Sequence, residues 1–179
     1  VCIGVNYADR NEEYRDGSER PKWPSLFLRT PASFVAHGEP ILRPPESPQL
    51  DYEGEIAIVI GRAGRRIPRA RAAAHVAGLT CVNEGTIRDW LRHGKFNVTQ
   101  GKNFEASGAI GPWIATADGF DGFGGLRVRT RVNGELRQDQ SNSLSGAGLG
   151  GDHVESSGAC ATKIAVGGVL QTLITGVSV

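Results

Sequence analysis

The stretch LDYEGEIAIVIG, residues 50–61, joins two glutamates to an apolar run. The residues after the second glutamate are mostly Ile and Val, which favour a strand. Side chains at positions i and i+2 of a strand share one face, so Glu53 and Glu55 point the same way. We therefore expect a strand that begins with two neighbouring carboxylates on one face.

Two carboxylates this close repel each other unless a cation neutralises them. A divalent ion would meet that need, and oxygen-only ligands favour Mg²⁺, Mn²⁺ or Ca²⁺ over zinc. The alternative is a strand end with two solvated acids, which is the more common fate of an isolated Glu-x-Glu pair. The pair by itself leaves both interpretations open.

The rest of the chain predicts strands, turns and few helices. Its 25 glycines and 9 prolines leave few windows for a long helix. Alternating residues around Asn133-Gly134 are typical of a hairpin with a type I′ turn. Residues 68–78 are Ala-rich and predict one helix, and residues 86–94 predict a second, short one that Thr86 would cap. The expected fold class is α+β, predominantly β, with strands over residues 1–7 and 80–85 and two short strands within residues 25–45.

Length and charge narrow the class of protein. A chain of 179 residues predicts a single domain, and a net charge of +1 leaves no basic footprint for nucleic acid. No apolar run approaches the ~20 residues that would span a membrane. Three widely spaced cysteines predict reduced thiols in a cytoplasmic protein. They are Cys2, Cys81 and Cys160.

The two ends of the chain differ from its middle. The chain starts at Val1 inside an apolar segment and contains no methionine, so we expect a domain that is incomplete at its N-terminus. Residues 141–179 contain no aromatic residue and no arginine. We interpret them as an atypical tail of the single domain 1–179.

A second group of polar residues follows the strand at residues 80–85. The segment VNEGTIRDW, residues 82–90, places Glu84 and Asp89 where a strand meets a helix, and Arg88 lies between them. A third acid could complete a metal site here, and Arg88 could face an anionic substrate. Lys102 follows in QGKNF. The simpler interpretation is acids at a helix start beside a solvated arginine, with Lys102 in an exposed loop.

The order of these segments resembles the fumarylacetoacetate hydrolase (FAH) family. The resemblance covers about residues 1–140 and rests on five segments in order: GVNYADRNEEY, DYEGEIAIVIG, VNEGTIRDW, QGKNFEASGAIGPW and VNGELRQDQ. It implies a mixed, mostly β roll with a few short helices, usually a homodimer. It also implies Mg²⁺ or Mn²⁺ and a 2-oxo acid substrate.

The resemblance assigns roles to particular residues. The family's Glu-x-Glu metal ligands fall on Glu53 and Glu55, and its third metal carboxylate, usually an aspartate, falls on Glu84. The family's arginine matches Arg88, which would bind a substrate carboxylate, and its lysine matches Lys102. Lys102 would stabilise a developing oxyanion.

The lid segment departs from the family pattern. Catalytic members carry a histidine and, three residues later, a glutamate that together activate water. The glutamate matches Glu13, but the histidine position is Arg10. Arginine stays protonated near neutral pH and cannot act as a base. We therefore expect Glu13 to shuttle protons, and either Arg88 or Arg10 to bind a distal carboxylate of the substrate.

The resemblance implies metal-stabilised enolate chemistry on 2-oxo or 2-hydroxy-dienoic dicarboxylic acids of aromatic-compound catabolism. Isomerisation or decarboxylation needs no activated water, so the loss of the histidine favours these reactions. One alternative is a C–C bond hydrolase of acylpyruvates or similar β-diketo acids. Another is a non-catalytic, dimeric relative that binds metal.

Overall fold

A computed structural model describes residues 1–4, 25–93, 98–124, 126–141 and 172–178. A central sheet has the strand order β3-β8-β6-β5, in which β3 runs parallel to β8 and the other pairs are antiparallel. The strands are β3 Phe34–Ala36, β5 Gly54–Ile60, β6 Val76–Asn83 and β8 Gly108–Thr116. The prediction of a mostly β, α+β fold is confirmed.

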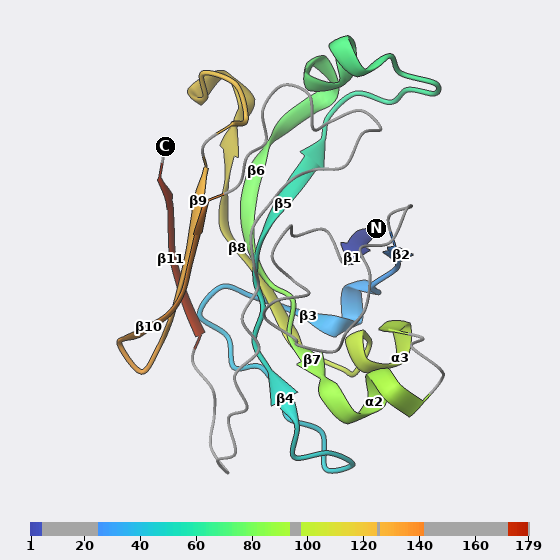
Figure 1. The fold of residues 1–179 in the computed structure, drawn as a ribbon, viewed down its shortest axis with the longest axis vertical. Helices are drawn as coiled ribbons and strands as arrows, with labels where there is room; N and C mark the ends of the chain where they lie inside the picture. Colours follow the sequence, from blue (N-terminus) through green and yellow to red (C-terminus); the bar gives the residue numbers. More distant parts are fainter. Residues whose placement is uncertain (5–24, 94–97, 125, 142–171, 179) are drawn as a thin grey trace, which may run out of the picture.

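A second sheet packs against one face of the central sheet (Figure 1). In it β9 (Arg127–Val132) lies between β10 (Glu135–Ser141) and β11 (Thr172–Ser178). Leu79, Phe123 and Leu126 form the core between the two sheets. The sheets approach closely at Gly54, where a Cβ would lie 2.0 Å from Thr130 Oγ1, so only glycine fits there.

Gln138 joins the two sheets at the same point. Its Oε1 accepts a hydrogen bond from Gly54 N at 3.1 Å, and its Nε2 donates one to Gly54 O at 2.9 Å. Thr130 Oγ1 donates to the same Oε1 at 2.8 Å. The start of β5 is therefore held from the second sheet by a buried amide.

Short elements surround the beginning of β5 (Figure 1). Ile41, Leu50 and Ile87 form a second core. Trp90 and Phe104 pack against it in edge-to-face contact, with 5.1 Å between their ring centroids. Three-residue strands β1 and β2 pair with each other, and two-residue strands β4 and β7 do the same. The bounds are β1 Cys2–Gly4, β2 Ser25–Phe27, β4 Leu50–Asp51, β7 Thr86–Ile87, α2 Arg88–His93 and α3 Val98–Lys102; the 3₁₀ turns are η1 Pro31–Ser33, η2 Arg69–His75 and η3 Ala117–Gly119.

Several predicted elements are confirmed. Asn133 and Gly134 have φ of 52° and 82°, as the type I′ hairpin turn requires. One strand lies within residues 1–7 and two short strands lie within residues 25–45, as predicted. Cys2 and Cys81 are free thiols, while Cys160 lies outside the described residues. No helix in the described part of the chain is long and apolar enough to cross a membrane.

Other predicted elements are wrong. Residues 68–78 form no α-helix: a 3₁₀ helix over Arg69–His75 leads directly into β6, because pairing with β5 buries Leu79 in the core. Thr86 lies in β7 and caps no helix, since α2 begins at Arg88. Lys102 is not in an exposed loop but is the last residue of α3, where its side chain is buried.

Candidate functional site

The three glutamates of the predicted metal site lie at one end of the β5-β6 pair. Glu84 N donates to Glu53 O at 2.7 Å, which extends the antiparallel ladder past the pair Gly54–Asn83. Cross-strand partners share a face, as do positions i and i+2, so this register puts all three glutamates on one face. Glu53 and Glu84 are buried, and Glu55 is half-buried.

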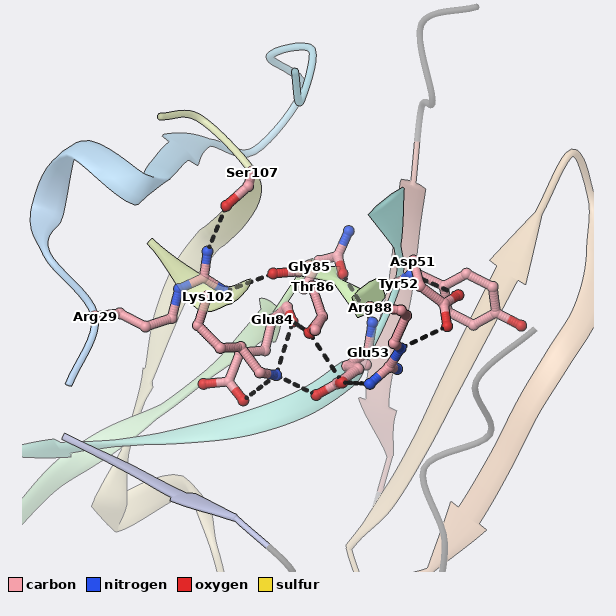
Figure 2. Close-up of polar contacts among 12 residues, drawn as sticks. Arg29, Asp51, Tyr52, Glu53, Glu84, Gly85, Thr86, Arg88, Lys102 and Ser107 are labelled. Carbon is pink, nitrogen blue, oxygen red and sulfur yellow. Dashed lines mark hydrogen bonds and ion pairs between the residues drawn. The ribbon is translucent and has the colours of Figure 1, made fainter. Parts of the chain in front are cut away.

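Lys102 lies between two of these carboxylates. Its Nζ is 2.5 Å from Glu53 Oε2 and 3.0 Å from Glu84 Oε2, and it also donates to Glu84 O at 3.2 Å (Figure 2). The short helix α3 brings it there, and the ring of Phe27 lies 5.4 Å from the ammonium. The two acids and the lysine thus form a buried cluster in which one ammonium offsets part of the charge of two carboxylates.

Arg88 lies on the other side of Glu53 (Figure 2). Its Nη1 is 2.7 Å from Glu53 Oε1, and its Nε donates to Asp51 Oδ2 at 2.9 Å. Because Arg88 is the first residue of α2 and its N–H donates to Gln49 O at 2.9 Å, the backbone holds this guanidinium beside β4. Asp51 was not predicted as a site residue, because nothing in its local sequence shows that Arg88 reaches it.

The charges around Glu53 control its protonation. Burial alone would raise the pKa of Glu53, but Lys102 and Arg88 outweigh burial and lower the pKa to about 2. The hydroxyl of Thr86, 2.9 Å from Glu53 Oε1, also favours the carboxylate. Burial raises the pKa of Asp51, against the opposing effect of Arg88. Glu53 is therefore ionised at any physiological pH.

The thiol of Cys2 faces the same cluster. Burial and a hydrogen bond to the Glu84 carboxylate raise the pKa of Cys2 to about 12. A thiol with this pKa stays protonated near neutral pH and is a poor nucleophile. Cys2 therefore acts as a neutral neighbour of Glu84.

Arg29 is a further site residue that the sequence did not reveal. It donates to Ser33 Oγ at 3.1 Å, to Gly85 O at 3.2 Å and to Ser107 Oγ at 3.0 Å, as Figure 2 shows for the last two. Its guanidinium also lies 4.2 Å from the centre of the Phe34 ring. Arg29 thus holds the backbone turn that follows Glu84, a role that depends on contacts distant in sequence.

The donor set fits a hard cation in its chemistry. One carboxylate oxygen of Glu53 and one of Glu84 both contact the ammonium of Lys102. Mg²⁺ and Mn²⁺ prefer oxygen ligands of this kind. Within the described residues, no three His, Cys, Asp or Glu side chains converge as a metal-holding group. The set Glu53, Glu55 and Glu84 therefore stays a prediction, as does binding of a substrate carboxylate by Arg88.

The two predicted lid residues cannot be placed. Arg10 and Glu13 lie outside the residues that the structure describes. Their roles rest on the sequence resemblance, so both stay predictions. The described cluster consists of residues from β4 to α3, together with Cys2 and Arg29.

Comparison with known proteins identifies the class to which this fold and site belong. A family model described as "Fumarylacetoacetate (FAA) hydrolase C-terminal" matches residues 1–144. The chain belongs to the fumarylacetoacetate hydrolase family, which confirms the resemblance seen in the sequence.

Three relatives show which members of the family are similar to this chain. The chain is 40% identical over 145 residues to oxaloacetate tautomerase YisK of Bacillus subtilis, covering 80% of this chain and 48% of the relative. Among solved structures, 5-carboxymethyl-2-hydroxymuconate delta-isomerase of Mycobacterium smegmatis has a TM-score of 0.66 at 34% identity, covering 78% and 53% of the two chains. Fumarylpyruvate hydrolase of Pseudomonas aeruginosa, solved with Mn²⁺ and pyruvate, has a TM-score of 0.67 at 29% identity, covering 78% and 62%. The chain spans about half the length of the curated relatives it matches.

Proposed function

We propose that this chain carries the site of an enzyme that enolises a short 2-oxo dicarboxylic acid such as oxaloacetate. The observation that carries the proposal is the buried convergence of Glu53 and Glu84 on Lys102, with Arg88 alongside. Relatives named tautomerase and delta-isomerase support it, because both names denote a proton shift. In this reaction a proton leaves C3 of the substrate and a proton joins the C2 oxygen.

Glu53, Glu55 and Glu84 would hold a divalent ion in this site, Mg²⁺ or Mn²⁺ in preference to Ca²⁺. The structure of a relative with Mn²⁺ and pyruvate supports a divalent ion. When bound, such an ion supplies Lewis acidity toward the substrate carbonyl. Glu53 suits a ligand better than a base, because a carboxylate whose pKa is about 2 takes up protons poorly at neutral pH.

Four side chains would stabilise charge, bind the substrate and transfer the proton. Lys102 would place its positive charge near the C2 oxygen as negative charge develops there, because its ammonium is buried beside the carboxylates that would hold the ion. Arg88 would orient a substrate carboxylate from the other side of Glu53. Glu13 would take the proton from C3, and Arg10 would bind the distal carboxylate.

A second candidate function is hydrolysis of a C–C bond in an acylpyruvate. The similarity to a fumarylpyruvate hydrolase favours it, whereas the arginine at position 10 disfavours it, because arginine cannot activate water. We also propose that the protein acts as a homodimer, which light scattering of the purified protein would test. If metal binding occurs without any turnover, the chain is a non-catalytic relative.

Solvent exchange tests the proposed reaction directly. In D₂O with Mg²⁺ or Mn²⁺, the protein should accelerate deuterium uptake at C3 of oxaloacetate, followed by proton NMR. E53Q should lose both metal binding and exchange, whereas E39Q, which alters an exposed glutamate in a turn, should keep both. Absence of exchange by a protein that binds metal would overturn the proposed reaction.

A further inference from the structure

The loop between β5 and β6 concentrates positive charge that the proposed reaction does not use. We call residues 61–75 the arginine tip. No acidic residue occurs between Glu55 and Glu84, so nothing in this stretch offsets the charge. Its five arginines fall within ten residues: Arg62, Arg65, Arg66, Arg69 and Arg71. Figure 1 shows the tip projecting at the end of the central sheet, and it lies at the opposite end of β5 from Glu53.

Four of the five arginines of the tip are exposed. Arg62, Arg65, Arg66 and Arg71 are exposed and form no ion pair with the described residues. Elsewhere on the surface Arg137 pairs with Glu135 at 2.8 Å, so pairing is available to other exposed arginines of this chain. The chain has a net charge of +1, so removing five arginines leaves 15 basic and 19 acidic residues, a net −4. Without the arginines of the tip, the chain is therefore net negative.

The backbone presents these arginines on a closed loop. Gly61 N and Arg62 N both donate to His75 O, at 2.9 and 3.2 Å, and His75 Nδ1 lies 2.9 Å from Arg62 O. Two apolar side chains lie beside the charge: Ile60 is 66% exposed at the end of β5, and Ile67 is 36% exposed. The tip thus combines basic and apolar groups on one preformed projection.

This combination favours one kind of polyanion. Single-stranded nucleic acid binding uses aromatic side chains as stacking platforms, and no Phe, Trp or Tyr occurs between Tyr52 and Trp90. The net −4 of the remaining chain would also repel a long polyanion that ran past the tip. A lipid surface instead takes up basic residues at its anionic headgroups and apolar side chains at the acyl boundary.

We propose that the arginine tip docks the protein onto an anionic lipid surface. Arg62, Arg65, Arg66 and Arg71 contact the headgroups, and Ile60 inserts beside them. Because the tip is at the far end of β5 from Glu53, the docked protein keeps its proposed active site away from the lipid. Docking through the tip does not depend on the proposed reaction.

Vesicle co-sedimentation of the purified chain tests the proposal. We expect binding to phosphatidylcholine vesicles that contain phosphatidylserine, none to phosphatidylcholine alone, and loss of binding at high salt. R65Q/R71Q should weaken binding about 30-fold, the effect of two charges at ~1 kcal/mol each. I60S should weaken binding to vesicles without changing the response to salt.

A matched variant separates the tip from general charge. R131Q/R137Q removes the same charge from exposed positions in the β9-β10 hairpin and should bind anionic vesicles like the wild type. Equal loss in both double variants would overturn the proposal, as would equal binding to both kinds of vesicle. Tighter binding to duplex DNA than to anionic vesicles, with no effect of I60S, would assign the tip to nucleic acid and overturn the lipid assignment.

Discussion

Lys102 Nζ lies 2.5 Å from Glu53 Oε2, and both side chains are buried. The lysine at the end of α3 thus neutralises an acid at the start of β5, across 49 residues of sequence. Burying a charge costs free energy unless a partner compensates it, so each of these side chains depends on the other. The same dependence makes the cluster sensitive to any added cation.

Removing the ammonium should destabilise the protein strongly. K102M leaves Glu53 and Glu84 buried with less compensation, which we expect to cost about 3 kcal/mol of the free energy of unfolding in urea. The control R127M removes an exposed partner of Asp139 and should cost far less. Saturating Mn²⁺ should stabilise K102M more than wild type. Equal stability of K102M and wild type would contradict the buried pair.

Stability should fall in acid because of Glu53. Its pKa is about 2 in the folded state against an ordinary value of 4.5, so the native state binds fewer protons than the unfolded state. The contribution is present above the unfolded pKa and is lost as the pH falls from about 5 toward 2, at most about 3 kcal/mol. Urea unfolding at a series of pH values should show that the free energy of unfolding falls less steeply with decreasing pH in E53Q than in the wild type. An unchanged slope would assign the acid sensitivity to other groups.

Arg29 should control the position of the turn after Glu84. R29K keeps the charge but cannot reach Ser33, Gly85 and Ser107 together, so we expect Mn²⁺ affinity to fall about tenfold by calorimetry. R43K is the matched control, because Arg43 donates to a backbone carbonyl, that of Ser47, on a different loop. If both variants lower the melting temperature but neither changes Mn²⁺ affinity, Arg29 is structural only. A wild type that binds no Mn²⁺ would instead count against the metal site.

Gly85 should not tolerate a side chain. A Cβ at this position would lie 1.9 Å from Ser107 O, a backbone atom that cannot move independently. We expect G85A to lose more than about 3 kcal/mol of stability, or to fail to fold. G119A is the control, because a Cβ there meets nothing within 4 Å and the backbone φ is not positive. Similar melting temperatures for the two variants would contradict the close approach at Gly85.

The thiol of Cys2 should alkylate slowly near neutral pH. With a pKa of about 12 it is almost wholly protonated, and peptide mapping after iodoacetamide treatment should show little label in the native protein. E84Q removes the negative charge that helps to raise this pKa, so labelling of Cys2 should become faster. Labelling of native Cys2 as fast as in the unfolded chain would contradict this prediction.

The sequence predicted which residues lie together better than it predicted their contacts. Glu53, Glu84, Arg88 and Lys102 were all identified from motif order, and the structure brings these four together. Asp51 and Arg29 were missed, because their contacts with Arg88, Gly85 and Ser107 join residues 37 to 78 positions apart in the sequence. Such contacts follow from the packing of short loops, which leaves no local pattern.

The errors in predicted secondary structure have a related cause. Alanine favours helix, yet the segment before His75 supplies few apolar groups that a helix could bury. Strand pairing from Val76 onward buries Leu79 against Phe123 and Leu126, which outweighs local propensity. The Asn133-Gly134 turn was predicted correctly because its two residues favour positive φ by themselves.

The side-chain amide of Gln138 links the second sheet to the strand that follows Glu53. It forms hydrogen bonds with both the N–H and the carbonyl of Gly54, the residue between Glu53 and Glu55. A change at Gln138, although its own strand carries none of the proposed site residues, would therefore alter the spacing of those two carboxylates. In a survey of natural variants, position 138 should therefore be grouped with the proposed active-site positions. For the same reason, the second sheet cannot be redesigned independently of the central sheet.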